Sequence, residues 1–153
     1  MSDAQNEGAL RAEHVLEYPF RRSLGPILQR FFTGLAEQRF EGARTPSGKV
    51  IVPPAEYDPD TSEAITEADL VEVGPGGTVT TWSWVAKPRE KQPFAHPFAF
   101  ALVKLDGADA PMLHAVDAGD ESKMKTGMRV QPRWAAEPQG SIRDLECFVP
   151  EEA

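Results

Sequence analysis

The residues of this chain that can do chemistry are few and stand far apart. Three histidines, His14, His96 and His114, could act as bases or metal ligands, but no two share the H-x-x-x-H spacing that places two imidazoles on one helix face. The single cysteine, Cys147, follows Glu146 in an apolar segment. Burial and a neighbouring carboxylate both raise the pKa of a thiol, which disfavours the nucleophilic thiolate. We therefore expect Cys147 to be a core residue.

The other common catalytic and ligand-binding motifs are not found in the sequence. Ser83 and Ser141 lack the G-x-S-x-G pattern of a nucleophile elbow. The glycine-rich turn at residues 74–77 is not followed by the G-K-[ST] of a phosphate loop, and the acidic stretch at 58–67 lacks the ligand spacing of a calcium loop. The sequence thus predicts no catalytic residue, unless the fold brings a histidine to a carboxylate.

Composition and charge exclude several classes of protein. With 41% hydrophobic and 26% charged residues over 153 positions, the chain is typical of a globular protein. Its 16 basic and 24 acidic residues give a net charge of −8, which disfavours binding to phosphate backbones. One cysteine allows no internal disulfide, and no apolar run reaches the roughly 20 residues of a membrane-spanning helix. We expect a cytoplasmic protein.

The elements that must position any site begin with a helix. After a polar stretch at 1–13, expected to be a frayed tail, residues 16–40 show helical periodicity, and Pro26 suits a first helical turn. Two interpretations of the apolar stripe remain open: it covers the core of its own domain, or it docks into a groove of a partner. The stripe contains Ile27, Leu28, Phe31, Phe32 and Leu35.

The rest of the chain is expected to be mostly β. A brief strand at 50–52 lies among prolines and acidic residues in the 41–69 region. Further strands are expected at 70–73, 78–85, 98–105, 112–116, 127–134 and 145–149, which suits a small barrel or sandwich. Strict alternation over 78–85 would place Thr80 on the same face as Trp82 and Trp84. A basic cluster, Lys87, Arg89 and Lys91, falls in a proline-rich loop.

Three stretches in this order and spacing resemble the DUF35 family of OB-fold proteins, which is associated with acyl-CoA metabolism. They are the F-F-x-G-L segment at 31–35, the glycine, short strand and Pro-Pro pair at 48–54, and the strands at 77–83 and 127–130. The resemblance covers about residues 26–150. It implies an N-terminal tail and helical arm at 1–40, a degenerate rubredoxin-like ribbon at 41–69, and a C-terminal OB-fold barrel of five or six strands at 70–153.

The chain departs from this family at the positions of the metal ligands. The family's ribbon carries two C-x-x-C pairs, whereas the matching positions here are Arg44, Ser47, Asp58 and Thr61. A structural zinc site of this type needs four sulfur or imidazole ligands. We therefore expect no zinc and no other cofactor. The ribbon is then either partly loose or held by the packing of Val50, Ile51, Val52 and Tyr57.

The resemblance implies a non-catalytic accessory subunit. It would bind and stabilise a thiolase-like enzyme or a lipid-transfer-protein-type aldolase acting on acyl-CoA, including CoA esters of steroid side chains, and help to form the CoA channel; some relatives are tied to MaoC-like hydratases instead. The candidate partner contacts are Ile27, Phe31, Phe32 and Leu35. The candidate contacts to CoA phosphates are Lys87, Arg89 and Lys91, for which a solvated loop is the alternative.

Two functions of other classes are also considered. An OB-fold protein can bind single-stranded nucleic acid by stacking bases on aromatic side chains, for which Trp82, Trp84 and Trp134 are available. A small independent enzyme acting on acyl-CoA would require His96 or His114 to meet a carboxylate in space.

Overall fold

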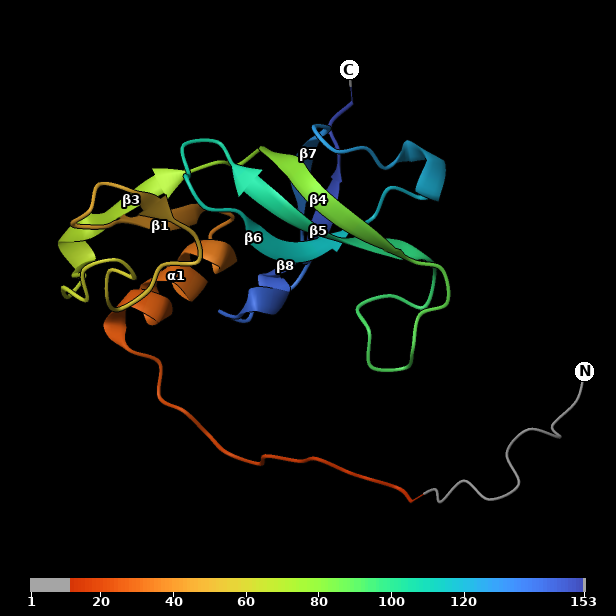
Figure 1. Cartoon of the computed structure of the whole chain (residues 1–153), viewed down its shortest axis with the longest axis horizontal. Helices are drawn as coiled ribbons and strands as arrows, with labels where there is room; N and C mark the ends of the chain where they lie inside the picture. The colour runs from red at the N-terminus through yellow and green to blue at the C-terminus, as the bar shows by residue number, and fades with distance from the viewer. Residues whose placement is uncertain (1–11, 153) are drawn as a thin grey trace, which may run out of the picture.

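The computed structural model describes residues 12–152, and the expected tail at 1–13 lies outside the described residues except for its last two positions. In Figure 1 a helix and a small sheet occupy one end of the molecule and a β-barrel occupies the other. Among the described residues, no helix combines the length and hydropathy needed to cross a bilayer. Over residues 12–152 the fold is mostly β with one α-helix, as predicted.

The helix α1 spans Pro26–Ala36 and is shorter than the predicted 16–40. Proline occupies its first turn, and the residue before a proline is disfavoured in the helical region, so the helix cannot continue backwards through Gly25. At its other end Gln38 adopts a positive φ of 60°, which turns the chain into the first strand. Residues 12–25, here called the N-terminal segment, contain no helix or strand.

A three-stranded antiparallel sheet follows the helix. It consists of β1 (Phe40–Arg44), β2 (Val50–Ile51) and β3 (Leu70–Val73), in the order β2-β1-β3. The strand at 70–73, which the sequence analysis assigned to the barrel, thus pairs with β1 instead. Gly42 in β1 is required by close packing, because a Cβ there would lie 2.9 Å from Cγ2 of Val52. The sheet includes the region 41–69, where a ribbon was expected, and extends to Val73.

Five strands form a closed barrel in the order β4-β5-β6-β8-β7, which confirms the predicted OB-fold. They are β4 (Gly77–Val85), β5 (Phe98–Leu105), β6 (Met112–Val116), β7 (Arg129–Trp134) and β8 (Leu145–Pro150). Two 3₁₀ turns, η2 (Glu121–Lys123) and η3 (Ile142–Asp144), lie between barrel strands, and a third, η1 (Glu67–Asp69), precedes β3. The parallel strands β6 and β8 pair only at Val116 and Phe148.

A β-bulge at Thr80 changes which face of β4 points inward. Val79 pairs with Val103 but Thr81 pairs with Leu102, so Thr80 is the extra residue of the bulge. Beyond it, Trp82 and Trp84 lie opposite Ala101 and Ala99, which are buried, and pack against the main core. The expectation that Thr80 shares a face with the two tryptophans is therefore wrong, because strict alternation does not survive a bulge.

One core joins the helix, the small sheet and the barrel. The ring of Phe40 in β1 lies 5.0 Å from that of Trp134 and 6.1 Å from that of Phe148, both in the barrel. Phe31 and Leu35 of α1 belong to the same buried cluster. A separate small cluster, centred on Phe98 and Cys147, lies under the loop of residues 86–97 that connects β4 to β5. This loop will be called the 86–97 loop.

Candidate functional site

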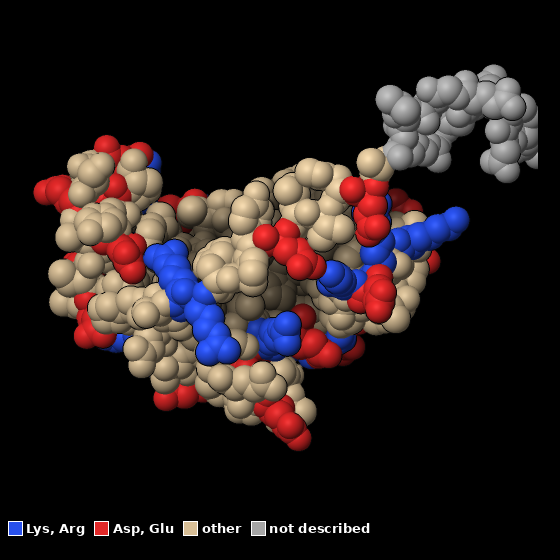
Figure 2. Space-filling model, turned by 90° about the horizontal axis from the view of Figure 1, so that it is seen from below, with Lys and Arg blue, Asp and Glu red and all other residues tan. Residues whose placement is uncertain are grey.

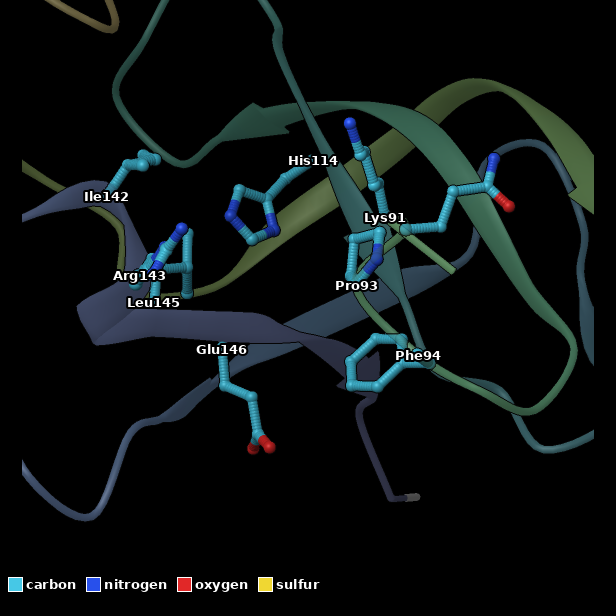
Figure 3. A pocket seen from close by; sticks show the side chains of 9 residues that line it. Lys91, Pro93, Phe94, His114, Ile142, Arg143, Leu145 and Glu146 are labelled. Atoms are coloured by element: carbon cyan, nitrogen blue, oxygen red, sulfur yellow. The ribbon is translucent and has the colours of Figure 1, made fainter. Parts of the chain in front are cut away.

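A cleft of about 550 Å³ opens where β6 and β8 are not paired, and it is the candidate site. His114 comes from β6, residues 145 and 146 begin β8, residues 142 and 143 belong to η3, and residues 91–94 of the 86–97 loop form the opposite wall (Figure 3). This volume falls within the range of small-molecule sites. In OB-folds the loops after the first and fourth barrel strands flank the ligand-binding face, and both contribute here.

The cleft is positively charged although the chain is acidic. Within residues 12–152, neither Lys91 nor Arg143 forms an ion pair, whereas the carboxylate of Glu146 accepts a 2.7 Å hydrogen bond from Nε of Arg133. The cleft therefore has two uncompensated cations. Figure 2 shows the face on which η3 and the 86–97 loop lie, with Lys and Arg side chains around a hollow and Asp and Glu side chains among them. Such a cleft favours an anionic ligand.

His114 lies in the cleft as a neutral ring. Burial lowers the pKa of His114 below its ordinary value, so the imidazole is uncharged at neutral pH. Its ring meets that of Phe148 edge to face at 5.9 Å, and its Nδ1 is buried without a hydrogen-bond partner in the described part of the chain. The side chain as a whole is half-buried. A buried polar atom without a partner requires an explanation.

His96 lies close to the carboxylate of Asp117. Such a contact is what the sequence analysis required of an independent enzyme. Nε2 of His96 lies 3.4 Å from Oδ2 of Asp117, but the same oxygen accepts a 3.0 Å hydrogen bond from Arg133. Cys147, the chain's one thiol, is fully buried, and burial raises its pKa to about 11. Cys147 is thus the core residue predicted from the sequence, and it cannot serve the His96–Asp117 pair as a nucleophile.

The three candidate CoA contacts all lie exposed on the 86–97 loop, but only Lys91 lines the cleft. The loop is anchored by Phe94, whose ring stacks on His96 at 5.0 Å and meets Phe98 edge to face at 5.5 Å. Lys87 and Arg89 lie elsewhere on the loop. The sequence analysis did not assign Phe94 or Arg143 to a site, because nothing in their local sequence indicates that the fold brings them together.

The candidate partner contacts on α1 require correction. Ile27, Phe31 and Leu35 are 2%, 0% and 1% exposed and pack inside the chain's own core. They are not accessible to a partner while the fold is intact, and only Phe32 remains partly exposed. Of the two interpretations left open, the structure shows the first, in which the helix covers its own core.

The positions that match the family's zinc ligands do not fit a metal. Asp58 is buried, and its carboxylate accepts hydrogen bonds from the backbone N–H groups of Ser47 (2.7 Å) and Asp60 (2.8 Å). Burial alone would raise the pKa of Asp58, but these bonds outweigh it and lower the pKa to about 2. Arg44 is exposed, and Thr61 offers only a hydroxyl. Residues 12–152 contain no cluster of three metal-ligating side chains.

The small sheet is nevertheless packed. Val50 and Val52 are buried in the main core, and Ile51 packs against a second cluster. Tyr57, expected to contribute, is exposed and does not.

The alternative of nucleic-acid binding lacks a stacking surface. Trp82, Trp84 and Trp134 pack against the barrel core rather than projecting into solvent, where bases could stack on them.

Comparisons with known proteins agree with this fold. Residues 70–135 match the family model described as the ChsH2 C-terminal OB-fold domain. No curated protein matches the chain. Two solved structures are similar: a protein of unknown function from the DUF35 family of Sulfolobus solfataricus (TM-score 0.58, 20% identity, 76% of this chain and 80% of that one), and a chain of the Ltp2-ChsH2(DUF35) aldolase (TM-score 0.60, 20% identity, 85% and 98%). The chain therefore shares the OB-fold of these two structures, and its residues 70–135 are similar to the ChsH2 C-terminal domain.

Proposed function

We propose that this chain is a non-catalytic subunit of an enzyme complex, and that its partner is a thiolase-like enzyme or lipid-transfer-protein-type aldolase acting on acyl-CoA. The fold supports this role, because the similarity to a chain of the Ltp2-ChsH2(DUF35) aldolase extends over 98% of that chain. The chemistry supports it as well, since the His96–Asp117 pair in the described chain has no activated thiol beside it.

The observation that carries the proposal is the exposed apolar surface of the N-terminal segment. Five of the eight large hydrophobic side chains that are exposed among the described residues fall within positions 15–24. Tyr18 and Phe20 are the most exposed of them, at 76% and 77%. Figure 1 shows this segment running away from the folded body. Clustered apolar side chains that a chain does not bury itself mark a protein-binding surface. The five are Val15, Leu16, Tyr18, Phe20 and Leu24.

In this proposal the N-terminal segment takes the role that the sequence analysis gave to the helix. Aromatic side chains supply most of the burial energy at protein interfaces, and Tyr18 and Phe20 are free to supply it. Phe32 lies partly exposed about two helical turns from the segment and extends the contact. The helix itself holds the segment at a fixed point, because α1 is anchored in the core through Phe31.

The proposed contact with substrate is made by the 86–97 loop. Lys87, Arg89 and Lys91 are exposed on it and form no ion pair with any residue in the range 12–152. At the edge of a CoA channel these cations would complement the phosphates of the CoA ester. Replacing all three by Ala is expected to raise the KM of the complex for the acyl-CoA and to leave its kcat unchanged, because only ground-state charge contacts are lost.

The decisive experiment is co-expression with thiolase-like proteins encoded nearby, followed by size-exclusion chromatography with light scattering. A mixed complex whose activity neither chain shows alone establishes the accessory role. The matched variants are Leu16→Ser/Tyr18→Ser/Phe20→Ser, expected to abolish the complex, and Leu113→Ser, an equally exposed apolar residue on the barrel, expected to retain it. If the chain stays monomeric with every thiolase-like protein tested, the proposal is refuted. If it forms a complex only with a MaoC-like hydratase, the accessory role stands but the partner is the hydratase.

A further inference from the structure

The cleft between the 86–97 loop and η3 has the two kinds of surface that a small amphipathic ligand requires. One wall is aromatic: Phe94, fixed between His96 and Phe98, faces the cleft from the loop. The other wall is aliphatic, formed by Leu145 and by Ile142, which is 40% exposed. A ligand that covers this exposed isoleucine removes apolar surface from water, which favours binding. The two walls suit a flat apolar body.

The charges of the cleft are arranged at its two sides. Lys91 comes from the loop and Arg143 from η3, and neither is neutralised by a carboxylate in the part of the chain that the structure describes. Among residues 12–152, eight ion pairs involve other Lys and Arg side chains, including Arg133, which binds the one carboxylate of the cleft, Glu146. Two unpaired cations on an acidic chain therefore face the same space, and they suit a single anionic group.

The ring of His114 lies between these walls. In Figure 3 it stands between Ile142, Arg143 and Leu145 on one side and Lys91 and Pro93 on the other. It is a neutral hydrogen-bonding group with a buried Nδ1 that has no partner in residues 12–152. Leaving such an atom unpaired costs free energy that an apolar side chain of similar size would avoid. Because Nδ1 itself is buried, a contact between this ring and a ligand in the cleft falls to the other ring nitrogen, Nε2.

We propose that this cleft binds a small ligand with one phosphate or carboxylate group on a flat apolar body. Arg143 and Lys91 hold the anion, Phe94 and Ile142 cover the body, and His114 gives a directional polar contact. Two cations are too few for the basic groove that tracks a nucleic-acid strand, so the ligand is small. The inference goes beyond the proposed function because it concerns the chain without a partner, and it can fail while the accessory role stands.

The test is a titration of the full, isotope-labelled chain followed by ¹H–¹⁵N NMR. Phenyl phosphate and 3-phenylpropionate carry both features and distinguish a phosphate ester from a carboxylic acid, whereas inorganic phosphate carries only the charge and benzyl alcohol only the body. We expect saturable shifts at residues 91, 92, 94, 114 and 142–146 with at least one of the first two probes, and weaker binding of the last two by tenfold or more. Equal affinity for inorganic phosphate or for benzyl alcohol, or no saturable shift, overturns the proposal.

Variants distinguish the cleft from general charge attraction. Arg143→Ala is expected to raise the Kd about tenfold, as the loss of one charge-assisted hydrogen bond implies. Lys125→Ala removes the same charge from an exposed site outside the cleft and is expected to leave the Kd unchanged. His114→Leu is expected to weaken binding while the remaining amide spectrum stays that of the folded chain. Equal effects of Arg143→Ala and Lys125→Ala would show a surface charge effect only and refute the site.

Discussion

The backbone N–H of Ser47 donates a 2.7 Å hydrogen bond to the buried carboxylate of Asp58, and this bond joins two loops of the small sheet. The same carboxylate accepts the N–H of Asp60 at 2.8 Å, and at the surface Lys49 binds Asp60. In the family that the sequence resembles, these two loops carry the cysteine pairs. A carboxylate and backbone donors make the connection here.

We predict that this connection depends on pH. The folded-state pKa of Asp58 is about 2 against an ordinary value of 3.8, so its contribution to stability is complete above about pH 4 and is lost as the pH falls towards 2. Asp58→Asn should therefore lower the melting temperature at pH 7 and reduce the loss of stability between pH 4 and pH 2. Thermal unfolding across this range measures both effects.

The matched control is Asp60→Asn, which changes the charge in the same loop at a half-exposed site. An exposed ion pair contributes at most about 1 kcal/mol, so this variant should stay close to the parent protein at every pH. If both variants lost the same stability with the same pH profile, the buried carboxylate would not be the element that joins the loops.

Truncating either of the two adjacent phenylalanines of α1 should lower the free energy of unfolding, but by very different amounts. Phe31 is fully buried in the core, and Phe31→Ala should lower the free energy of unfolding by about 3–5 kcal/mol. Phe32 is partly exposed, and Phe32→Ala should cost on the order of 1 kcal/mol. Urea denaturation gives both values. Similar losses for the two variants would contradict the burial pattern. Because Phe31 is buried, a charged substitution there would unfold the protein and could not be used to test partner binding.

Alternation and turn residues were enough to locate most of the barrel. The strands expected at 98–105 and 112–116 have the same bounds in the structure, because each begins and ends beside glycine, proline or aspartate. The strand Phe40–Arg44 was missed because it contains Glu41 and Gly42, residue types that are uncommon in strands. The helix was extended too far, because the apolar residues before Pro26 resemble a continuation of its stripe.

The candidate cleft could not be predicted from the sequence, for a different reason. Its parts come from the 86–97 loop, β6, η3 and β8, and only the barrel's strand order places them together. Lys91 was found because it belongs to a visible basic cluster. Arg143 stands alone in a polar stretch, and the burial of His114 follows from a strand pair, not from its neighbours in the chain.

Removing the unpartnered atom of His114 should stabilise the isolated protein. His114→Leu keeps most of the volume and replaces a buried polar group by an apolar one, so the free energy of unfolding should rise by about 1–2 kcal/mol. Chemical denaturation at pH 7 measures the change. A loss of stability would show that Nδ1 has a partner in the folded protein that must be kept.

Cys147 should be unreactive in the native protein. Its side chain is fully buried and its pKa is raised to about 11, so almost no thiolate is present at pH 8. A colorimetric disulfide reagent should label it only as fast as the barrel opens, and at once in denaturant. Rapid labelling without denaturant would mean that the cluster around Phe98 opens readily.

The bulge at Thr80 has an optical consequence. By turning Trp82 and Trp84 inward it brings all three tryptophans of the chain, with Trp134, against one core. The intrinsic fluorescence of the protein is therefore a reporter of the barrel interior, while the cleft, walled by Phe94, and the N-terminal segment, with Tyr18 and Phe20, hold no indole. An emission change on adding a partner would thus signal that docking at the periphery is transmitted into the barrel itself.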